Sequence, residues 1–222
     1  MSDYPLLFIE RSRDEKSTNM KSSDKLLMTF VKSPELGKAK TRLAETIGKA
    51  KALEIYEALL SHTKSIIHDI PLDKMVIYAE QISHNDIWNE DVFKKDLQCE
   101  GDLGKRMETA FSNAFDQGYK KVVIIGSDCY DLNEKIILEA FNELDNNDVI
   151  LGPAFDGGYY LLGMKKLHRE LFDDMPWSTD KLLATTQEVM EDIELSNNLL
   201  TPLSDIDYEE DLKGDLLAIV KN

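Results

Sequence analysis

The segment at residues 122–131, VVIIGSDCYD, constrains the fold of this chain more than any other stretch. Its first four residues are β-branched and apolar, which is typical of a parallel strand buried on both faces. The run stops at Gly126, and Asp128 follows where the chain leaves the predicted sheet. Because ligands of open α/β sheets collect at the carboxyl ends of strands, Asp128 is predicted either to hold Mg²⁺ or Mn²⁺ or to cap the next helix.

Strand-like and helix-like segments alternate along the rest of the chain. Strands are predicted at residues 25–31, 74–79, 93–98, 122–125, 148–151 and 199–203. Helices are predicted at residues 41–70 with a break near Gly48, 103–117, 134–144 and 209–220, with another ending near 192. This alternation predicts an α/β fold, a three-layer α/β/α sandwich with a mostly parallel sheet. We expect residues 25–222 to form one domain, and residues 1–24 to be a loosely attached extension.

Charge and composition limit the partners of such a domain. The net charge is −16, from 42 acidic and 26 basic residues, and a surface of this sign repels nucleic acid and anionic lipid. The apolar runs are too short to cross a membrane, and the two cysteines have neither a metal-site spacing nor the number needed for a disulfide framework. We therefore expect a cytoplasmic protein that binds small molecules, with no nucleic acid and no membrane span.

A basic loop, KSPELGKAKTRL at residues 32–43, follows the first predicted strand. It carries four cations and one acid in an otherwise acidic protein, and Pro34 marks it as a loop. A loop that enters a helix directs free backbone N–H groups and the positive end of the helix dipole toward an anion. This pattern predicts a phosphate-binding loop, with a solvated basic turn as the alternative. The predicted phosphate ligands are Lys32, Gly37, Lys38, Lys40 and Arg42.

Two glycine-containing segments are further candidates. In CEGDLGKRM, residues 99–107, the backbone at glycine is predicted to approach a nucleotide phosphate, or else the segment is an ordinary turn with a capping aspartate. The residues concerned are Gly101, Asp102, Gly104 and Arg106. In GPAFDGGYYLLG, residues 152–163, the pattern predicts either a site for a sugar or base or a hairpin turn. The residues concerned there are Asp156, Gly157, Gly158 and Tyr159.

An acidic pair completes the set of candidates. Asp205 and Asp207 alternate about Ile206, so in an extended segment both carboxylates face the same side. If that side faces Asp128, either of them supplies a second metal ligand. The alternative is a solvated acidic run before the last helix.

These segments, taken in order, resemble the successive motifs of one family. The motifs are KSPELGKAKTRL, GDLGKRM, IIGSDCYDL, VILGPAFDGGYYLLG, LFDDMPWST and SDIDYEEDL, and the resemblance covers about residues 26–212. They resemble the radical-SAM/selenodomain-associated glycosyltransferase family, part of the nucleotide-diphospho-sugar transferase superfamily with a GT-A-type fold. The resemblance implies a nucleotide-binding fold, a basic loop on the nucleotide phosphates, metal ligands at Asp128 and at Asp205 or Asp207, and an acceptor or sugar pocket at the DGGYY segment.

One departure concerns the loop that carries Asp128. The family usually has proline after the cysteine of this motif, whereas this chain has Tyr130. Proline would stiffen the loop. We therefore expect Tyr130 in its place to affect the geometry of the loop that carries Asp128.

The sequence therefore predicts a transferase that depends on Mg²⁺ or Mn²⁺ and uses a nucleoside-diphosphate sugar, a glycosyltransferase in which Asp128 and Asp156 are catalytic. Its partners would be a nucleotide or nucleotide-sugar donor and a small-molecule acceptor. One alternative is a nucleotidyltransferase that moves a nucleoside monophosphate from an NTP to a small phosphorylated or acidic metabolite and releases pyrophosphate. Another is a nucleotide-binding protein without catalysis.

Overall fold

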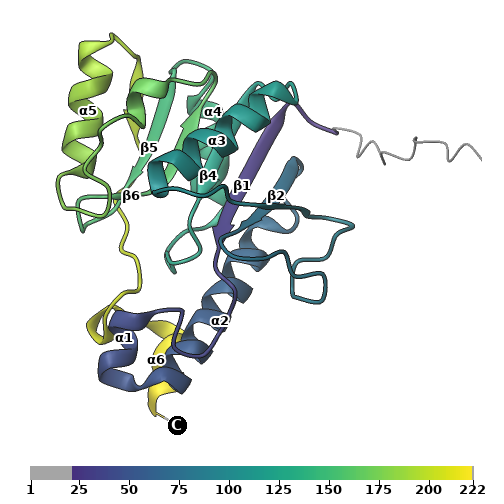
Figure 1. The fold of residues 1–222 in the computed structure, drawn as a ribbon, viewed down its shortest axis with the longest axis vertical. Helices are drawn as coiled ribbons and strands as arrows, with labels where there is room; N and C mark the ends of the chain where they lie inside the picture. Colours follow the sequence, from purple (N-terminus) through teal and green to yellow (C-terminus); the bar gives the residue numbers. More distant parts are fainter. Residues whose placement is uncertain (1–21, 222) are drawn as a thin grey trace, which may run out of the picture.

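The computed structural model describes residues 22–221, and its centre is an open sheet (Figure 1). In these residues seven strands form one sheet in the order β3-β2-β1-β4-β6-β5-β7. The strands are β1 (Lys25–Val31), β2 (Asp73–Tyr78), β3 (Lys94–Leu97), β4 (Lys121–Ile125), β5 (Val149–Pro153), β6 (Tyr159–Met164) and β7 (Asn197–Leu199). β6 runs antiparallel to its neighbours β4 and β5, and the other pairs are parallel. The predicted mostly parallel sheet is confirmed.

Helices cover both faces of this sheet. Side chains alternate across β4, so that Val123 and Ile125 pack toward α2 (Lys49–Ile67) and α4 (Glu134–Glu143). Val122 and Ile124 pack toward α3 (Leu103–Asp116) and α5 (Leu182–Asp192) on the opposite face. Because β4 is covered on both sides, all four of these residues are buried, as their apolar run predicts.

A small helical layer lies on the outer side of α2. α1 (Thr41–Ile47) and α6 (Gly214–Lys221) pack there in a cluster that includes Leu43, Leu59 and Leu216, at the lower end of Figure 1. α1 and α2 are separated at Gly48, whose φ of 84° ends the first helix where the sequence predicts a break. α2 is therefore buried on two sides, which holds the C-terminal helix against the body of the protein.

The C-terminal segment differs from its predicted elements. β7 ends at Leu199, and Leu203 makes an isolated bridge with Ala154 beyond it. Pro202 has no N–H to donate, so the continuous strand predicted at 199–203 is interrupted. The helix predicted at 209–220 is instead a short 3₁₀ helix, Glu209–Asp211, followed by α6, which starts at Gly214 with φ 52°.

The predicted extension at residues 1–24 lies outside the described residues, apart from residues 22–24. The backbone N–H and hydroxyl of Ser22 both donate to Asp73 at the start of β2. None of the helices within residues 22–221 combines the length and the apolar character of a membrane span.

Candidate functional site

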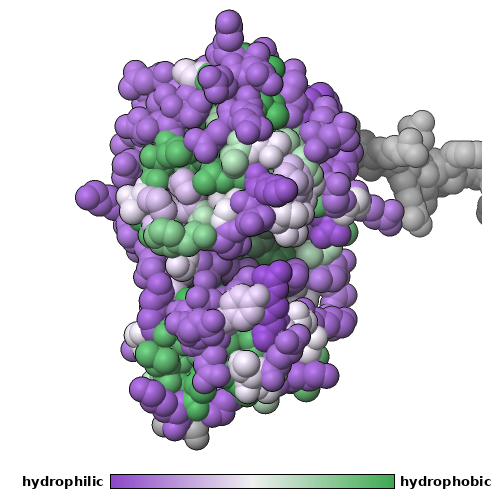
Figure 2. Space-filling model, turned by 90° about the vertical axis from the view of Figure 1, so that its left-hand side faces the viewer, coloured by the Kyte–Doolittle hydropathy of each residue, from purple (hydrophilic) through white to green (hydrophobic). Residues whose placement is uncertain are grey.

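A cavity of about 770 Å³ opens at the edge of the sheet where β1 and β4 end. Lys32 follows β1 and residues 126–128 follow β4, and both line it. Because β6 runs antiparallel to β4, its first residues, Tyr159 and Tyr160, line the same cavity. Figure 2 views the molecule from the left side of Figure 1 and shows its surface hollowed at mid-height, above the part formed by α1 and α6.

The cavity brings most of the predicted site residues together. Those that line it are Lys32, Lys38, Lys40, Arg42, Arg106, Asp128, Asp156, Gly158, Tyr159, Asp205 and Asp207. The predicted residues that do not contribute to its lining within the described part are Gly37, Gly101, Asp102, Gly104 and Gly157. The basic loop, the Asp128 loop and the C-terminal acidic pair thus share one cavity, although they are separated by long stretches of sequence.

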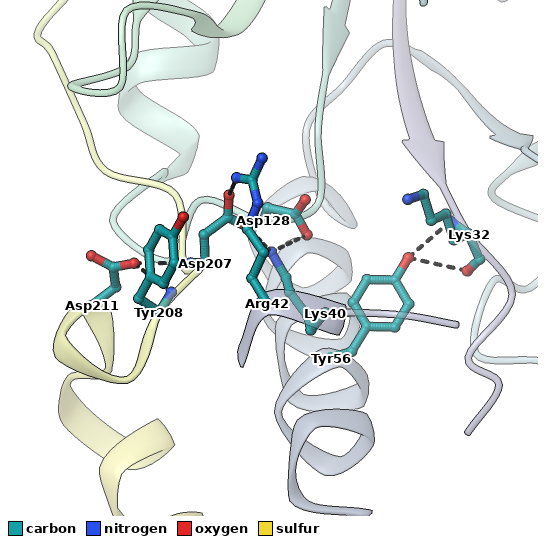
Figure 3. A network of polar contacts seen from close by, with 8 residues as sticks. All are labelled: Lys32, Lys40, Arg42, Tyr56, Asp128, Asp207, Tyr208 and Asp211. Carbon is teal, nitrogen blue, oxygen red and sulfur yellow. Dashed lines mark hydrogen bonds and ion pairs between the residues drawn. The ribbon is translucent and has the colours of Figure 1, made fainter. Parts of the chain in front are cut away.

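Lys40 joins these three segments directly (Figure 3). Its Nζ lies 3.0 Å from Oδ1 of Asp128 and 3.3 Å from Oδ1 of Asp207, and its side chain is only 4% exposed. The other carboxylate oxygen of Asp207 accepts a hydrogen bond from Nη1 of Arg42 at 2.9 Å. An ammonium group therefore lies between Asp128 and Asp207, and the sequence predicts that Asp128 shares a metal ion with either Asp205 or Asp207.

The backbone of Lys40 is held in a strained conformation. Its φ and ψ are 48° and 49°, in the left-handed region, immediately before α1. A residue with a Cβ loses about 1 kcal/mol or more in this region, and such conformations concentrate at functional sites. The surrounding structure thus holds Lys40 in place at some cost to stability.

Lys40 and the carboxylates around it shift one another's pKa values. Burial acts to lower the pKa of Lys40, but the attraction of Asp128 and Asp207 outweighs it and raises that pKa, so the side chain is charged. Burial, together with the charge of Asp128, raises the pKa of Asp205 to about 7. Asp156 acts on Asp205 in the same direction. Asp128, Asp205 and Asp207 thus lie on one side of the cavity, and Lys40 and Arg42 are the cations paired with Asp128 and Asp207.

The donor set fits a divalent cation that is accompanied by phosphate. Within residues 22–221, no three His, Cys, Asp or Glu side chains are arranged to hold a metal ion by themselves. The ammonium group of Lys40 nevertheless shows that a cation is held between Asp128 and Asp207. Mg²⁺ commonly takes one or two carboxylates and completes its coordination with water and substrate phosphates. Asp128 and Asp207 fit that pattern.

Tyr56 is a cavity residue that the sequence analysis does not single out. Its hydroxyl accepts a hydrogen bond from the backbone N–H of Lys32 at 2.8 Å and donates to the Lys32 carbonyl at 3.1 Å (Figure 3). Burial raises the pKa of Tyr56 to about 12, so the hydroxyl stays protonated. On sequence, Tyr56 belongs to the apolar stripe of α2; the only signal is that a buried tyrosine hydroxyl needs a polar partner. Tyr56 fixes the start of the basic loop.

The segment before α3 serves the helix and its arginine. Asp102 caps α3, because its Oδ1 accepts a hydrogen bond from the backbone N–H of Lys105 at 2.8 Å. Arg106 lines the cavity, and its Nε donates to the Gly101 carbonyl at 2.9 Å. A Cβ on Gly104 would overlap the Trp177 ring. Of the two predictions for Asp102, the structure thus shows the helix cap.

The DGG segment is the turn of the hairpin formed by β5 and β6. Oδ1 of Asp156 accepts a hydrogen bond from the backbone N–H of Gly158 at 2.9 Å, and both residues line the cavity. Gly157 has a φ of 88°, and a Cβ there would overlap the backbone of Asp180. The close approach that Gly157 permits is thus to the segment before α5, which forms another wall of the same cavity.

The C-terminal segment holds the Asp128 loop at several points. The Asp128 carbonyl accepts a hydrogen bond from the backbone N–H of Ile206 at 2.9 Å, and Lys213 pairs with Asp131. The Tyr130 ring lies 4.7 Å from the His62 ring, centroid to centroid. Contacts with the C-terminal segment and with His62 thus hold the loop that carries Asp128 and Tyr130.

Comparisons with known proteins agree on the fold. Residues 63–179 match the family DUF2064, described as "Uncharacterized protein conserved in bacteria". A crystal structure from Desulfovibrio desulfuricans G20, provisionally named a nucleotide-diphospho-sugar transferase, matches with a TM-score of 0.80 and 29% identity, over 90% of this chain and 97% of that chain. No curated protein matches this chain at a significant level.

Two further solved structures have the same fold at much lower identity. CMP:2-keto-3-deoxy-manno-octonic acid synthetase in complex with CTP matches with a TM-score of 0.51 and 9% identity, over 90% of this chain and 99% of that chain. The 4-diphosphocytidyl-2C-methyl-D-erythritol synthase of Anaerococcus prevotii DSM 20548 matches with a TM-score of 0.50 and 10% identity, over 89% and 96%. These matches place the chain in the fold of nucleotide-diphospho-sugar transferases and nucleotidyltransferases.

Proposed function

The chain belongs to the DUF2064 family of bacterial proteins, and we propose that it is a transferase that uses a nucleoside-diphosphate sugar together with Mg²⁺ or Mn²⁺. One observation carries the proposal. A basic loop and a group of carboxylates lie on the same cavity at the carboxyl edge of the sheet, and Lys40 bridges them. Cations suit a diphosphate, and carboxylates suit the divalent ion that accompanies it. The resemblance to the radical-SAM/selenodomain-associated glycosyltransferases favours sugar transfer.

The basic loop would bind the diphosphate. Lys32, Lys38 and Arg42 line the cavity, and Tyr56 holds the backbone of Lys32 in place. Arg42 has a side chain that is 58% exposed, and its guanidinium offers donors in the planar arrangement that matches phosphate oxygens. These cations would stabilise the negative charge that develops on the leaving diphosphate.

The carboxylates would hold the divalent cation. Asp128 and Asp207 are the proposed ligands, with Asp205 as a neighbouring carboxylate that also lines the cavity. A bound Mg²⁺ or Mn²⁺ would act as a Lewis acid that neutralises charge on the diphosphate oxygens.

Asp156 is the proposed base or sugar-hydroxyl ligand. An acceptor hydroxyl oxygen would form a bond to the anomeric carbon, and the bond from that carbon to the diphosphate oxygen would break. The electron pair leaves with the nucleoside diphosphate, and the hydroxyl proton passes to a base. Asp156 lies on the β5–β6 turn and lines the cavity, and its carboxylate accepts a hydrogen bond from the Gly158 N–H.

Nucleotidyl transfer is the second candidate for the same cavity. The four cations of the basic loop suit a triphosphate as well as a diphosphate. In that reaction the acceptor oxygen bonds to the α-phosphorus of an NTP and pyrophosphate leaves. The products separate the two: free nucleoside diphosphate indicates sugar transfer, and pyrophosphate indicates nucleotidyl transfer.

A thermal-shift screen tests the proposal. Nucleotides and nucleotide sugars are each added with Mg²⁺, Mn²⁺ or EDTA, and a ligand at 100 times its Kd stabilises the protein by about 2.7 kcal/mol. We expect one class of nucleotide sugar to raise the melting temperature, and EDTA to reduce the shift.

Two matched variants sharpen the screen. Asp128→Asn removes a proposed metal ligand and should abolish both the metal-dependent shift and turnover. Asp131→Asn makes the same substitution three residues further along the chain. Asp131 does not line the cavity and pairs with Lys213. The Asp131→Asn variant should keep both the metal-dependent shift and turnover. Stabilisation by no nucleotide at all, or full turnover in Asp128→Asn, would contradict the proposed function.

A further inference from the structure

We propose that Lys40 occupies the cation position of the nucleotide-free protein, so that a divalent ion binds strongly only together with a diphosphate. The inference deepens the proposed function and rests on it. Lys40 would release Asp128 and Asp207 when its ammonium group turns to an arriving diphosphate. Metal and diphosphate would then each raise the affinity of the protein for the other.

The position of Lys40 is the first observation. A single Nζ atom contacts Asp128 at 3.0 Å and Asp207 at 3.3 Å, and it comes from a side chain that is 4% exposed. Arg42, in the same loop, pairs with Asp207 but not with Asp128, and its side chain is 58% exposed. In Figure 3 the Lys40 side chain reaches into the space between the two carboxylates. Lys40 therefore occupies the place where an ion shared by both carboxylates would lie.

Charge is the second observation. A divalent ion added beside a charged Lys40 would be repelled at contact distance, because both groups are positively charged. The neighbouring cations cannot remove this repulsion, because they carry the same sign. An arriving diphosphate changes the balance, since its negative charge offers Lys40 an alternative partner. The carboxylates are then left to the divalent ion, whose own charge the diphosphate also offsets.

The anchoring of Lys40 is the third observation. Its left-handed backbone conformation, φ 48°, is unfavourable for lysine and is maintained by the surrounding fold. The basic loop that carries it is held at its start by the two hydrogen bonds between the Tyr56 hydroxyl and the backbone of Lys32. The side chain of Lys40 is flexible by contrast, with a four-carbon stem. Exchange of partner therefore requires movement of one side chain and not of the loop.

A matched lysine elsewhere provides the control. Lys95 is also 4% exposed, and its Nζ lies 2.9 Å from Asp86 and 3.8 Å from Glu90. It is a buried lysine between two carboxylates, as Lys40 is, but it does not line the cavity. Lys40→Met and Lys95→Met thus remove the same charge from similar surroundings, and only Lys40→Met should act on the proposed metal position.

The test measures binding of Mn²⁺ alone, by the electron paramagnetic resonance signal of free Mn²⁺. For the wild type we expect weak binding without an anion, and at least tenfold tighter binding with inorganic pyrophosphate, after correction for the complex of Mn²⁺ with pyrophosphate in a protein-free blank. For Lys40→Met without pyrophosphate we expect at least tenfold tighter binding than for the wild type. Lys95→Met should bind Mn²⁺ with the affinity of the wild type. The double variant Lys40→Met/Asp128→Asn should lose the gain in Mn²⁺ affinity that Lys40→Met alone provides.

By linkage, Mn²⁺ must raise the affinity of the wild type for pyrophosphate by the same factor as pyrophosphate raises that for Mn²⁺. Tight binding of Mn²⁺ to the wild type without pyrophosphate would overturn the inference. This measurement uses the wild-type protein alone, so it does not depend on whether the variants fold. Equal gains in Lys40→Met and Lys95→Met would also overturn it. Neither result affects the proposed function, which fails instead if no nucleotide or nucleotide sugar stabilises the protein.

Discussion

Asp205→Asn tests the electrostatics of the cavity through the pH dependence of stability. Burial and Asp128 raise the pKa of Asp205 from 3.8 to about 7 in the folded protein. Between these two values the folded protein holds a proton that the unfolded chain has lost. Stability contributed by this group therefore rises as the pH falls through 7 and becomes constant below the unfolded value of 3.8.

The magnitude follows from the size of the shift. One pKa unit corresponds to about 1.4 kcal/mol, so the free energy of unfolding should increase by about 1.4 kcal/mol between pH 8 and pH 6. For a domain of this size the corresponding rise in melting temperature is about 3 to 6 °C. Asp205→Asn carries no titratable proton, so it should lack this increase.

The assay is urea denaturation of both proteins at pH 8 and pH 6 in the presence of EDTA. The comparison with Asp205→Asn is needed because His168 acts in the opposite direction: burial lowers its pKa, so its contribution to stability falls as the pH falls. That contribution cancels between the two proteins. If the free energy of unfolding changes by the same amount between pH 8 and pH 6 in the wild type and in Asp205→Asn, the assignment of a raised pKa to Asp205 is refuted.

Two further predictions concern the walls of the cavity. Tyr56→Phe removes both hydrogen bonds to Lys32 and should lower the free energy of unfolding by about 1 to 2 kcal/mol in urea denaturation; an unchanged value would show that the hydroxyl does not hold the loop. Gly157→Ala should cost about 2 kcal/mol or more, because φ is 88° and the new Cβ overlaps Asp180. Gly48→Ala is its control: its φ is 84° with open space around it, so it should cost only about 1 kcal/mol. Equal losses in both alanine variants would contradict the close approach to Asp180.

The sheet and the position of Asp128 could be predicted from local sequence. The apolar run of β4 is long enough for a strand and too short for a helix, and it is buried on both faces as predicted. β1 has the predicted bounds, Lys25–Val31, and the helix break lies at Gly48. These features depend on residues that are neighbours in sequence, so the sequence alone is sufficient to predict them.

The glycine segments were ambiguous for a physical reason. An Asp-Gly pattern satisfies a hairpin turn as well as a ligand site, and an aspartate before a helix serves as a cap or as a ligand. The neighbours that distinguish these cases are Trp177 beside Gly104 and Asp180 beside Gly157. Both come from a segment that no local pattern relates to the glycines.

The sequence by itself determined most of the strands and helices, and it placed a basic loop and Asp128 directly after a strand each, because periodicity, glycine and charge act over a few residues. The tertiary structure alone decided that Lys40 lies between Asp128 and Asp207, two carboxylates far from it along the chain, and that Tyr56 holds Lys32. Such pairings depend on how the side chains of separate elements meet when the sheet, α1 and the C-terminal segment pack together. Local propensity carries no information about those distances.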